Sequence, residues 1–223
     1  MKKWIIGIGI ILTGFMSFSQ RHILVNTVGD VQEVGGYARQ LPAVEYSSDE
    51  IYTYFSPDDD VRQKLITAIE SERCSIYIAV FTLTDKRIAK ALWHAYRRGV
   101  KIQILTDPTC IKDRFNKINY LSHKGIPVYV YNIAHNGPSV YSCMHHKFAI
   151  FGCNGENKRY VWTGSFNFTK SASDSNQENV VVIHKRATVD RFEQQFQKIK
   201  ERSSRLTNAH STMLRNMTKN KGA

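Results

Sequence analysis

Three short segments of the chain carry side chains suited to chemistry at phosphorus. His145 and Lys147 stand one residue apart, Ser165 and Asn167 follow with the same spacing, and Glu178 comes next. On a β-strand, alternate side chains share a face, so the imidazole and the ammonium are expected about 7 Å apart along the strand, close enough to serve one phosphate group. The imidazole can attack phosphorus or transfer a proton, and the ammonium can neutralise phosphoryl oxygens.

The segment from Gly164 to Asn167 predicts a tight turn next to the same phosphate. Its backbone N–H groups, the Ser165 hydroxyl and the Asn167 amide can all donate to phosphate oxygens. Glu178 can accept from the second ring nitrogen of His145 and so fix the tautomer of that ring. Each segment alone is common in strands, turns and surfaces, so the prediction depends on their order within a short window.

These segments define a catalytic set and a phosphate-binding set. The predicted catalytic residues are His145, Lys147, Asn167 and Glu178. The predicted phosphate-binding residues are Lys147, Ser165 and Asn167.

The hydrophobic pattern indicates an α/β fold that positions these residues. Up to residue 131, strand-like apolar runs alternate with amphipathic stretches, a βαβαβ rhythm that predicts a sheet with parallel pairs and covering helices. We expect strands at 51–55, 75–82, 101–107, 128–131, 145–151, 160–163 and 179–182, and helices at 61–71, 85–98, 111–122 and 187–204. The fold class is therefore α/β, with a mixed, mostly parallel sheet flanked by helices.

Alternation along the predicted strand at 145–151 separates its side chains. His145 and Lys147 fall on one face, and His146, Phe148 and Ile150 fall on the other. The chain has no internal repeat and no second Gly-Ser-x-Asn segment, which predicts one copy of the motif per chain.

Charge and composition restrict the class of protein. The 223 residues include 31 Lys and Arg against 19 Asp and Glu, for a formal net charge of +12, and 42% of them are hydrophobic. Such a chain can build a packed core, which excludes a disordered or collagen-like protein, and its single apolar run excludes a multispanning membrane protein. The excess of positive charge predicts a polyanionic partner, either nucleic acid or an anionic membrane surface.

The first residues have the layout of a secretory signal peptide. Lys2 and Lys3 precede an apolar run from Trp4 to Met16, which is short for a bilayer span. We therefore expect an exported protein, periplasmic or secreted, with a membrane anchor as the alternative if the segment stays uncleaved. The remaining boundaries follow from pattern and charge: an irregular extension at 20–49, a catalytic domain at 50–206 and a basic tail at 207–223, after a signal peptide at 1–19.

The cysteines leave their pairing open. Export would place Cys74, Cys110, Cys143 and Cys153 in an oxidising compartment, where three pairings are possible. Cys143, His145, His146 and Cys153 match no standard zinc spacing, so no structural zinc is predicted.

Two stretches resemble a known family. "MHHKFAIFG" and "TGSFNFTKSASDSNQENVVV" are similar to the HxKx4D and GSxN signature of the phospholipase D superfamily, and the likeness covers roughly residues 50–205. The chain most resembles the single-motif group, which includes Nuc-type endonucleases and mitochondrial cardiolipin hydrolases. The resemblance implies that His145 is the nucleophile or general acid and that Glu178 orients it, while Lys147, Ser165 and Asn167 bind phosphate.

One position departs from the signature. The aspartate expected five residues after Lys147 is replaced by Gly152, and the nearest acid that follows is Glu156. The departure concerns support of the site more than its chemistry, because the histidine, lysine, asparagine and glutamate all remain.

The reaction itself predicts a dimer. Displacement through a covalent histidine needs a second group that protonates the departing oxygen and later activates water. Each chain offers one suitable imidazole, His145, so two chains are expected to pool their motifs about a two-fold axis. Lys147 already supplies positive charge, so no metal cofactor is expected and activity should survive EDTA.

Three functions fit these observations. A metal-independent endonuclease acting through a phosphohistidine is favoured by the net charge, by basic residues such as Arg97, Arg98, Lys101 and Lys112, and by tyrosines that could stack on bases (Tyr129, Tyr131 and Tyr141). A phospholipase D or cardiolipin hydrolase acting on anionic lipid is the first alternative. A non-catalytic nucleic-acid-binding protein is the second.

Overall fold

The computed structural model describes residues 31–34, 37–40, 51–132, 142–155 and 157–207. The chain divides into two units, Met1–Ser47 and Ser48–Ala223. In the first unit, β1 (Val31–Val34) and β2 (Tyr37–Gln40) pair antiparallel, although irregular structure was expected at 20–49. The Gly35-Gly36 pair between the two strands is a hairpin turn signal, which explains the difference.

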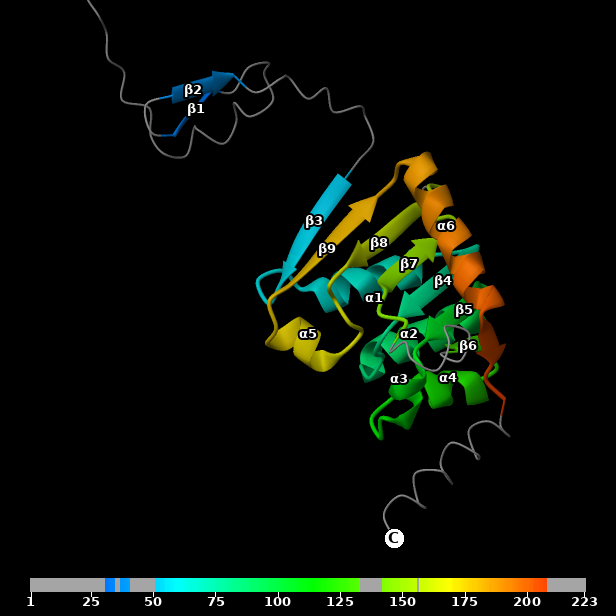
Figure 1. Ribbon diagram of the computed structural model, residues 1–223. Helices are drawn as coiled ribbons and strands as arrows, with labels where there is room; N and C mark the ends of the chain where they lie inside the picture. The colour runs from blue at the N-terminus through cyan, green and yellow to red at the C-terminus, as the bar shows by residue number, and fades with distance from the viewer. Residues whose placement is uncertain (1–30, 35–36, 41–50, 133–141, 156, 208–223) are drawn as a thin grey trace, which may run out of the picture. The chain divides into compact units, whose positions relative to one another are not determined.

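The second unit contains all the candidate site residues and is built on one sheet. Within the described residues, the order is β10-β6-β5-β4-β7-β8-β9-β3 (Figure 1). The strands are β3 (Ile51–Ser56), β4 (Ser75–Val80), β5 (Lys101–Thr106), β6 (Val128–Tyr131), β7 (Lys147–Phe151), β8 (Tyr160–Gly164), β9 (Glu178–Ile183) and β10 (Ser203–Arg205). The helices are α1 (Val61–Ser71), α2 (Lys86–Arg97), α3 (Pro108–Lys112), α4 (Ile118–His123), α5 (Lys170–Asp174) and α6 (Arg186–Glu201).

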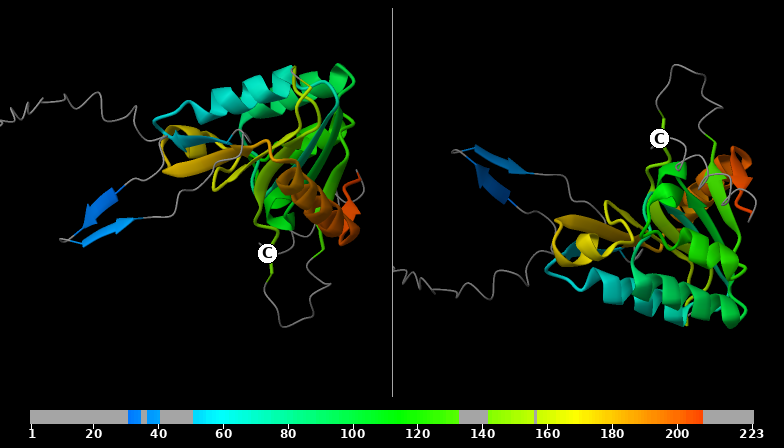
Figure 2. Two further views of the ribbon diagram at one scale, coloured as in Figure 1. Left: turned by 90° about the horizontal axis from the view of Figure 1, so that it is seen from above. Right: turned by 90° about the horizontal axis from the view of Figure 1, so that it is seen from below.

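Helices cover both faces of the sheet (Figure 2). The helices α1 and α2 lie on one face, where Leu65 and Leu92 are fully buried in the larger core cluster. The helix α6 lies on the other face, where Phe196 packs in the second cluster. Because neighbouring side chains of β7 point to opposite faces, Phe148 joins the second cluster and Ala149 joins the first.

The mixed α/β fold is confirmed, but the expectation of a mostly parallel sheet is wrong. Among the described strands of this sheet, β4 pairs parallel with β5 and β5 with β6, whereas the other five neighbouring pairs are antiparallel. Parallel neighbours need a long crossover, and in the described sheet only the helical connections from β4 to β5 and from β5 to β6 supply one between neighbouring strands. The strands β7, β8 and β9 follow one another without such a crossover, and β3 pairs with β9 instead of lying beside β4.

Two predicted helices end differently in the structure. The expected helix at 111–122 is interrupted between α3 and α4, where Asp113 Oδ1 accepts from Phe115 N at 2.8 Å and Asn116 Oδ1 accepts from Asn119 N at 3.1 Å. Such side-chain bonds offer the backbone an alternative to the helix. The expected helix at 187–204 ends at Glu201, because the next residues form β10 beside β6. None of the helices that the structure describes is long and apolar enough to cross a membrane.

The structure gives one of the cysteine pairings that the sequence left open. Cys74 and Cys153 form a disulfide with a Cα–Cα distance of 5.5 Å, which joins the residue before β4 to the turn after β7. Cys110 is a buried free thiol and Cys143 is an exposed one. Cys143, His145, His146 and Cys153 therefore cannot act together as zinc ligands, because the Cys153 sulfur is bonded to Cys74.

Candidate active site

The predicted site residues gather at one edge of the sheet. Lys147 is the first residue of β7, Gly164 is the last of β8, and Glu178 is the first of β9. Because these three strands run antiparallel in this order, the start of β7, the end of β8 and the start of β9 share an edge. The antiparallel course of these strands thus brings together residues that are far apart in sequence.

His145 and Lys147 form a direct pair. Lys147 Nζ lies 3.0 Å from His145 Nδ1 and donates to the His145 carbonyl oxygen at 2.7 Å. Both side chains also face Phe81, whose ring centroid is 4.5 Å from that of the imidazole and 5.2 Å from Nζ. His146 instead lies against Phe148, 5.5 Å away between ring centroids, so the predicted division into two faces is confirmed.

The strand begins two residues later than the sequence suggested. The expected strand at 145–151 is β7 at Lys147–Phe151, and His145 lies just before it and is exposed. The backbone still continues the ladder locally, because Phe81 N donates to the His146 carbonyl at 2.9 Å. An exposed imidazole beside a buried lysine can reach a substrate from solvent.

Lys147 places a partly desolvated ammonium in the site. Lys147 is only 9% exposed, and this burial lowers the pKa of its ammonium, opposed by the negative charges of Glu178 and Cys143. The pKa of His146 is also lowered, first by burial and then by the positive charges of Lys147 and His145. A partly desolvated ammonium attracts an anion strongly, because few waters compete for it.

Asn167 is oriented by a backbone group of the neighbouring segment. Thr82 N donates to Asn167 Oδ1 at 3.2 Å. Phe168 N donates to the Thr82 carbonyl at 3.0 Å, which keeps the two segments side by side. Because its oxygen is engaged, the Asn167 amide keeps its NH2 group as a donor for a phosphate oxygen.

Ser165 and Glu178 form the second direct pair. Ser165 Oγ donates to Glu178 Oε2 at 2.5 Å and accepts from Asn179 N at 3.1 Å, while Asn176 Nδ2 donates to Glu178 Oε1 at 3.0 Å. A Cβ atom at Gly164 would lie 2.0 Å from the Asn179 carbonyl oxygen, so the close approach of these segments requires glycine.

The expected bond between Glu178 and His145 is not among the hydrogen bonds of the described part of this chain. Both Glu178 oxygens accept from Ser165 and Asn176. Glu178 is nonetheless close enough for its charge to act on Lys147. Its role in orienting His145 stays a prediction.

A carboxylate that the sequence did not indicate lies near Gly152, which occupies the position of the signature aspartate. A Cβ atom at Gly152 would lie 2.3 Å from Ser75 Oγ, so a larger residue there must displace Ser75. Glu72, fully buried at the end of α1, instead directs Oε1 toward this corner, where it accepts from Cys74 N at 2.7 Å and from Cys153 N at 3.0 Å. Glu156 lies outside the described residues.

The carboxylate of Glu72 therefore supports the far end of β7. It also accepts from Arg73 N at 3.0 Å and Ser75 N at 3.1 Å. The sequence by itself does not indicate this role of Glu72, because it is the disulfide between Cys74 and Cys153 that places Gly152 next to Glu72. Glu72, Cys74 and Cys153 are also the one group in the described chain with metal-ligating atoms this close together, but both sulfurs are consumed by the disulfide.

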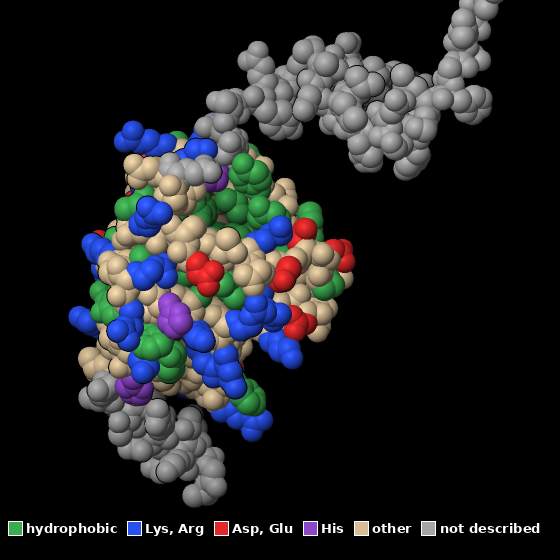
Figure 3. All heavy atoms as spheres, turned by 180° about the vertical axis from the view of Figure 1, so that it is seen from behind, with side chains coloured by type: hydrophobic (Ala, Val, Ile, Leu, Met, Phe, Trp, Pro, Cys, Tyr) green, Lys and Arg blue, Asp and Glu red, His purple; other side chains and the backbone are tan. Residues whose placement is uncertain are grey.

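The expected basic surface is present, whereas two of the tyrosines serve the core. Figure 3 shows many Lys and Arg side chains on the face opposite the view of Figure 1, the side on which α1 and α2 lie. The predicted bases are all exposed: Arg97, Arg98, Lys101 and Lys112. Tyr129 and Tyr131 are half-buried and pack against the cluster beneath α6, so they contribute to the core. Tyr141 lies outside the described residues.

The described domain is similar in sequence to a known family and to several known proteins. A family model described as "Cardiolipin synthase, PLD-like domain" matches residues 65–200. A phospholipase D of Rickettsia prowazekii is 33% identical over 152 residues, which are 68% of this chain and 68% of that protein. A mitochondrial cardiolipin hydrolase of Xenopus tropicalis is 28% identical over 141 residues, 63% of this chain and 61% of that protein.

Two solved structures share the fold. Nuc from Salmonella typhimurium, described as a phospholipase D family member, has a TM-score of 0.63 and 29% identity over 72% of this chain and 100% of its own. NucT from Helicobacter pylori has a TM-score of 0.62 and 27% identity over 70% of this chain and 98% of its own. The matched family region contains every candidate site residue.

Proposed function

The chain belongs to the single-motif group of the phospholipase D superfamily and is a phosphodiester hydrolase, and on that premise we propose that it is an endonuclease whose active site is shared by two subunits. His145 supplies the reacting imidazole, Lys147 and Asn167 bind the phosphate, and Glu178 orients His145. Ser165, expected from the sequence to bind phosphate, donates its hydroxyl to Glu178 and its backbone N–H to the Asn179 carbonyl, so it acts by holding Glu178. The observation that carries the proposal is the pairing of His145 with a buried lysine on a chain of net charge +12, because nucleic acid is the phosphodiester polyanion that such a chain attracts.

The reaction proceeds as two displacements at phosphorus. In the first, a ring nitrogen of His145 bonds to phosphorus while the bond from phosphorus to the leaving oxygen breaks, and a second imidazole protonates that oxygen. In the second, water attacks the phosphohistidine and the second imidazole takes a proton from the water as the phosphorus–nitrogen bond breaks. Lys147 Nζ and the Asn167 amide NH2 stabilise the negative charge on the phosphoryl oxygens in both steps.

The protonation states that the two steps need support a second imidazole. The leaving oxygen takes its proton from an imidazolium, which is protonated on both ring nitrogens and therefore cannot be the ring that attacks phosphorus. An attacking ring needs its proton on Nδ1, where a carboxylate such as Glu178 can hold it. Two rings in different states, one from each subunit of a homodimer, meet both needs.

A lipid phosphodiester is the second candidate substrate. Relatives named phospholipase D and mitochondrial cardiolipin hydrolase support it, and an anionic headgroup presents the same phosphodiester to the same residues. Nucleic acid is preferred because the exposed bases extend well beyond the site, over the face of α1 and α2 (Figure 3). A polyanion contacts such an extended surface, whereas one headgroup needs only the site residues.

The proposal is tested by offering the purified protein four substrates. Plasmid DNA, single-stranded DNA, RNA and cardiolipin vesicles are each incubated with and without EDTA, with His145→Ala in parallel. We expect cleavage of nucleic acid that survives EDTA, weakens steeply as salt rises, and is lost in the folded His145→Ala variant. Hydrolysis of vesicles alone identifies the lipid as substrate, and rescue by added metal after chelation rejects the metal-free mechanism.

We further propose that the protein works outside the cytoplasm. The apolar segment following Lys2 and Lys3 supports export, and the Cys74–Cys153 disulfide is the kind of bond that persists in oxidising compartments. N-terminal sequencing of the protein recovered from its native compartment tests the proposal: a start near Gln20 indicates a cleaved signal peptide, and an intact Met1 indicates an anchor.

A further inference from the structure

The loop that carries Asn167 is attached to the segment between β4 and α2. Thr84 N and Asp85 N both donate to the Phe168 carbonyl at 3.0 Å, and Leu83 forms a bridge with Phe168. Together with the bond from Thr82 N to Asn167 Oδ1, these contacts make the two segments one unit. The position of the Asn167 amide therefore depends on what holds this unit against the rest of the domain.

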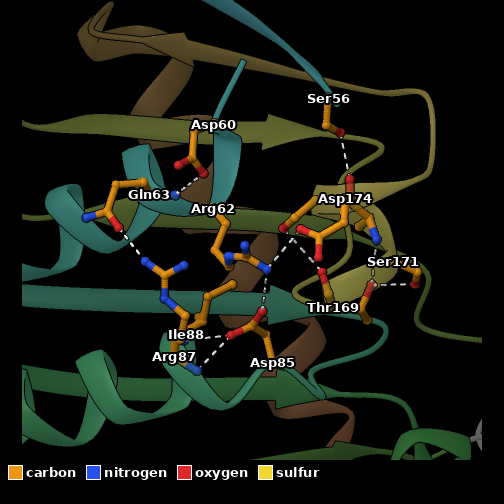
Figure 4. A network of polar contacts seen from close by, with 12 residues as sticks. Ser56, Asp60, Arg62, Gln63, Asp85, Arg87, Ile88, Thr169, Ser171 and Asp174 are labelled. Carbon is orange, nitrogen blue, oxygen red and sulfur yellow. Dashed lines mark hydrogen bonds and ion pairs between the residues drawn. The ribbon is translucent and has the colours of Figure 1, made fainter. Parts of the chain in front are cut away.

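Arg62 on α1 holds both sides of that unit (Figure 4). Its Nη1 atom lies 3.5 Å from Asp85 Oδ2 and 3.0 Å from Asp174 Oδ1. Asp85 precedes α2 and caps it, accepting from Arg87 N at 2.7 Å, whereas Asp174 ends α5. One guanidinium nitrogen thus links the two segments that flank the Asn167 loop.

The short helix α5 has few other attachments. It begins directly after the loop, where Thr169 Oγ1 accepts from Ala172 N at 3.1 Å, a bond internal to the segment. Ser56 Oγ donates to the Ala172 carbonyl at 2.6 Å and ties α5 to β3 (Figure 4). Ala172 is also fully buried in the larger core cluster, so the ion pair is the attachment that holds the exposed end of α5 at Asp174.

We infer that Arg62 and Asp174 are positioning residues that fix the phosphate-binding loop in its productive geometry. The inference rests on the proposed function, since it assigns the loop the task of holding the substrate phosphate. Neither residue touches the site; each acts through Asn167 and Ser165. Small displacements of groups that must align with a reacting phosphorus cause large losses in rate, so a modest shift of α5 has a measurable effect.

The two carboxylates differ in what their removal does. The Asp85 side chain is 4% exposed, so removing Arg62 leaves a buried charge without its partner and destabilises the whole domain. The Asp174 side chain is 35% exposed, and its removal leaves the Arg62–Asp85 pair intact. Asp174→Ala is therefore the variant that separates positioning from folding.

A matched control exists on α6. Asp190 pairs with Arg159 at the same distance of 3.0 Å, and both side chains are 41% exposed. Asp190 also lies 3.7 Å from Arg186 on its own helix, where the Arg186 side chain is 91% exposed. Its element lies under the opposite face of the sheet, away from the Asn167 loop. Asp190→Ala therefore removes a comparable surface ion pair without touching the loop.

The experiment compares Asp174→Ala, Asp174→Glu and Asp190→Ala with the unaltered protein. The readouts are kcat, KM, inhibition by inorganic phosphate and the thermal midpoint. For Asp174→Ala we expect kcat to fall about 10-fold or more and inhibition by phosphate to weaken, with a thermal midpoint no lower than that of Asp190→Ala. Asp174→Glu should recover much of the lost kcat, because the longer carboxylate can still reach Arg62.

Two outcomes overturn the inference. Equal kcat in Asp174→Ala and Asp190→Ala shows that the ion pair does not position the loop, and a fall in kcat that only follows a fall in thermal midpoint shows a purely structural role. His145→Ala is measured alongside. If that variant keeps its activity, the proposed function fails as well, whereas its inactivity confines the failure to Arg62 and Asp174.

Discussion

Lys147 keeps a positive charge where the fold disfavours one. The side chain is 9% exposed and starts a strand whose every residue is buried, and burial lowers the pKa of its ammonium. The buried charge thus lowers the stability of the folded chain, but it leaves an ammonium that a phosphate can contact. This trade is common where function, rather than folding, selects the residue.

Replacing Lys147 with methionine should separate stability from activity. Methionine has a similar length and fills the same space without a charge, so we expect the free energy of unfolding to stay equal or rise. Hydrolysis should fall by about 10²-fold or more, since a group that stabilises transition-state charge is lost. Urea unfolding and initial rates measure the two effects, and a variant that is both unstable and inactive contradicts this account.

The same burial sets the alkaline limit of activity. The folded pKa of Lys147 lies below its ordinary value of 10.5, so kcat/KM of the free enzyme should decline with rising pH before pH 10.5 is reached. The stability of the fold changes with pH in the opposite direction. The cost of burying the charged Lys147 is complete below its pKa in the folded state, and it disappears as the pH rises toward its pKa in the unfolded state. A pH profile of kcat/KM measures the limit.

Cys143 offers a control for this assignment. Its negative charge raises the pKa of Lys147, so Cys143→Ser should move the alkaline limit to lower pH, while the exposed serine leaves the fold unchanged. An alkaline limit that stays in place in Cys143→Ser indicates that another group titrates there.

At the scale of elements, β7 is held at both ends by different means. Near its first residue, Lys147 Nζ donates to the His145 carbonyl, and its far end is fixed by the Cys74–Cys153 disulfide and by Glu72. The Glu72 carboxylate accepts from four backbone N–H groups, two of them just before β4, one at its first residue and one after β7. Glu72 therefore joins neighbouring strands at a corner where the signature aspartate is absent.

Glu72→Ala should destabilise the domain strongly. Its removal leaves buried N–H groups without an acceptor, at a cost of about 3 kcal/mol or more in the free energy of unfolding. Glu70→Ala, an exposed change on the same helix, should stay within about 0.5 kcal/mol. Urea unfolding under non-reducing conditions gives both values, and similar losses in the two variants contradict the role of Glu72.

Local patterns of the chain predict its elements better than their pairing. The period-two alternation at 145–151 correctly separates Lys147 from Phe148, because the faces of a strand are a local property. The order of strands is set by contacts distant in sequence, such as those of Tyr54 with Val180, and no local pattern reports them. The prediction of a mostly parallel sheet is wrong for this reason.

The site shows the same division. Residue types and spacing identify His145, Lys147, Ser165, Asn167 and Glu178, and the structure gathers them at one edge. Glu72 and Arg62 were missed because each acts through contacts with a segment that only folding brings near. Buried support of this kind has no fixed spacing from the motif that it supports.

At the scale of the whole molecule, the charge of the chain and the count of its motifs point the same way. A net charge of +12 favours a long polyanion, and one motif per chain leaves each subunit with a single reacting imidazole. A substrate strand with phosphates in sequence can lie across two such subunits. The size of the active particle therefore decides whether the proposed mechanism is complete.

Mixing active and inactive chains should reveal a shared site. If both copies of His145 must act on one phosphodiester, a pair with one His145→Ala chain is inactive. Equal amounts of the two chains are unfolded together and refolded with the disulfide intact. The mixture should then show about one quarter of the activity of an equal total amount of protein that consists only of active chain, because random pairing makes about one quarter of the dimers fully active. Independent subunits would instead retain about half, as should a control in which the two proteins are refolded separately and mixed without exchange. Light scattering on the same samples gives the particle mass, and a monomer of full activity rejects the shared site.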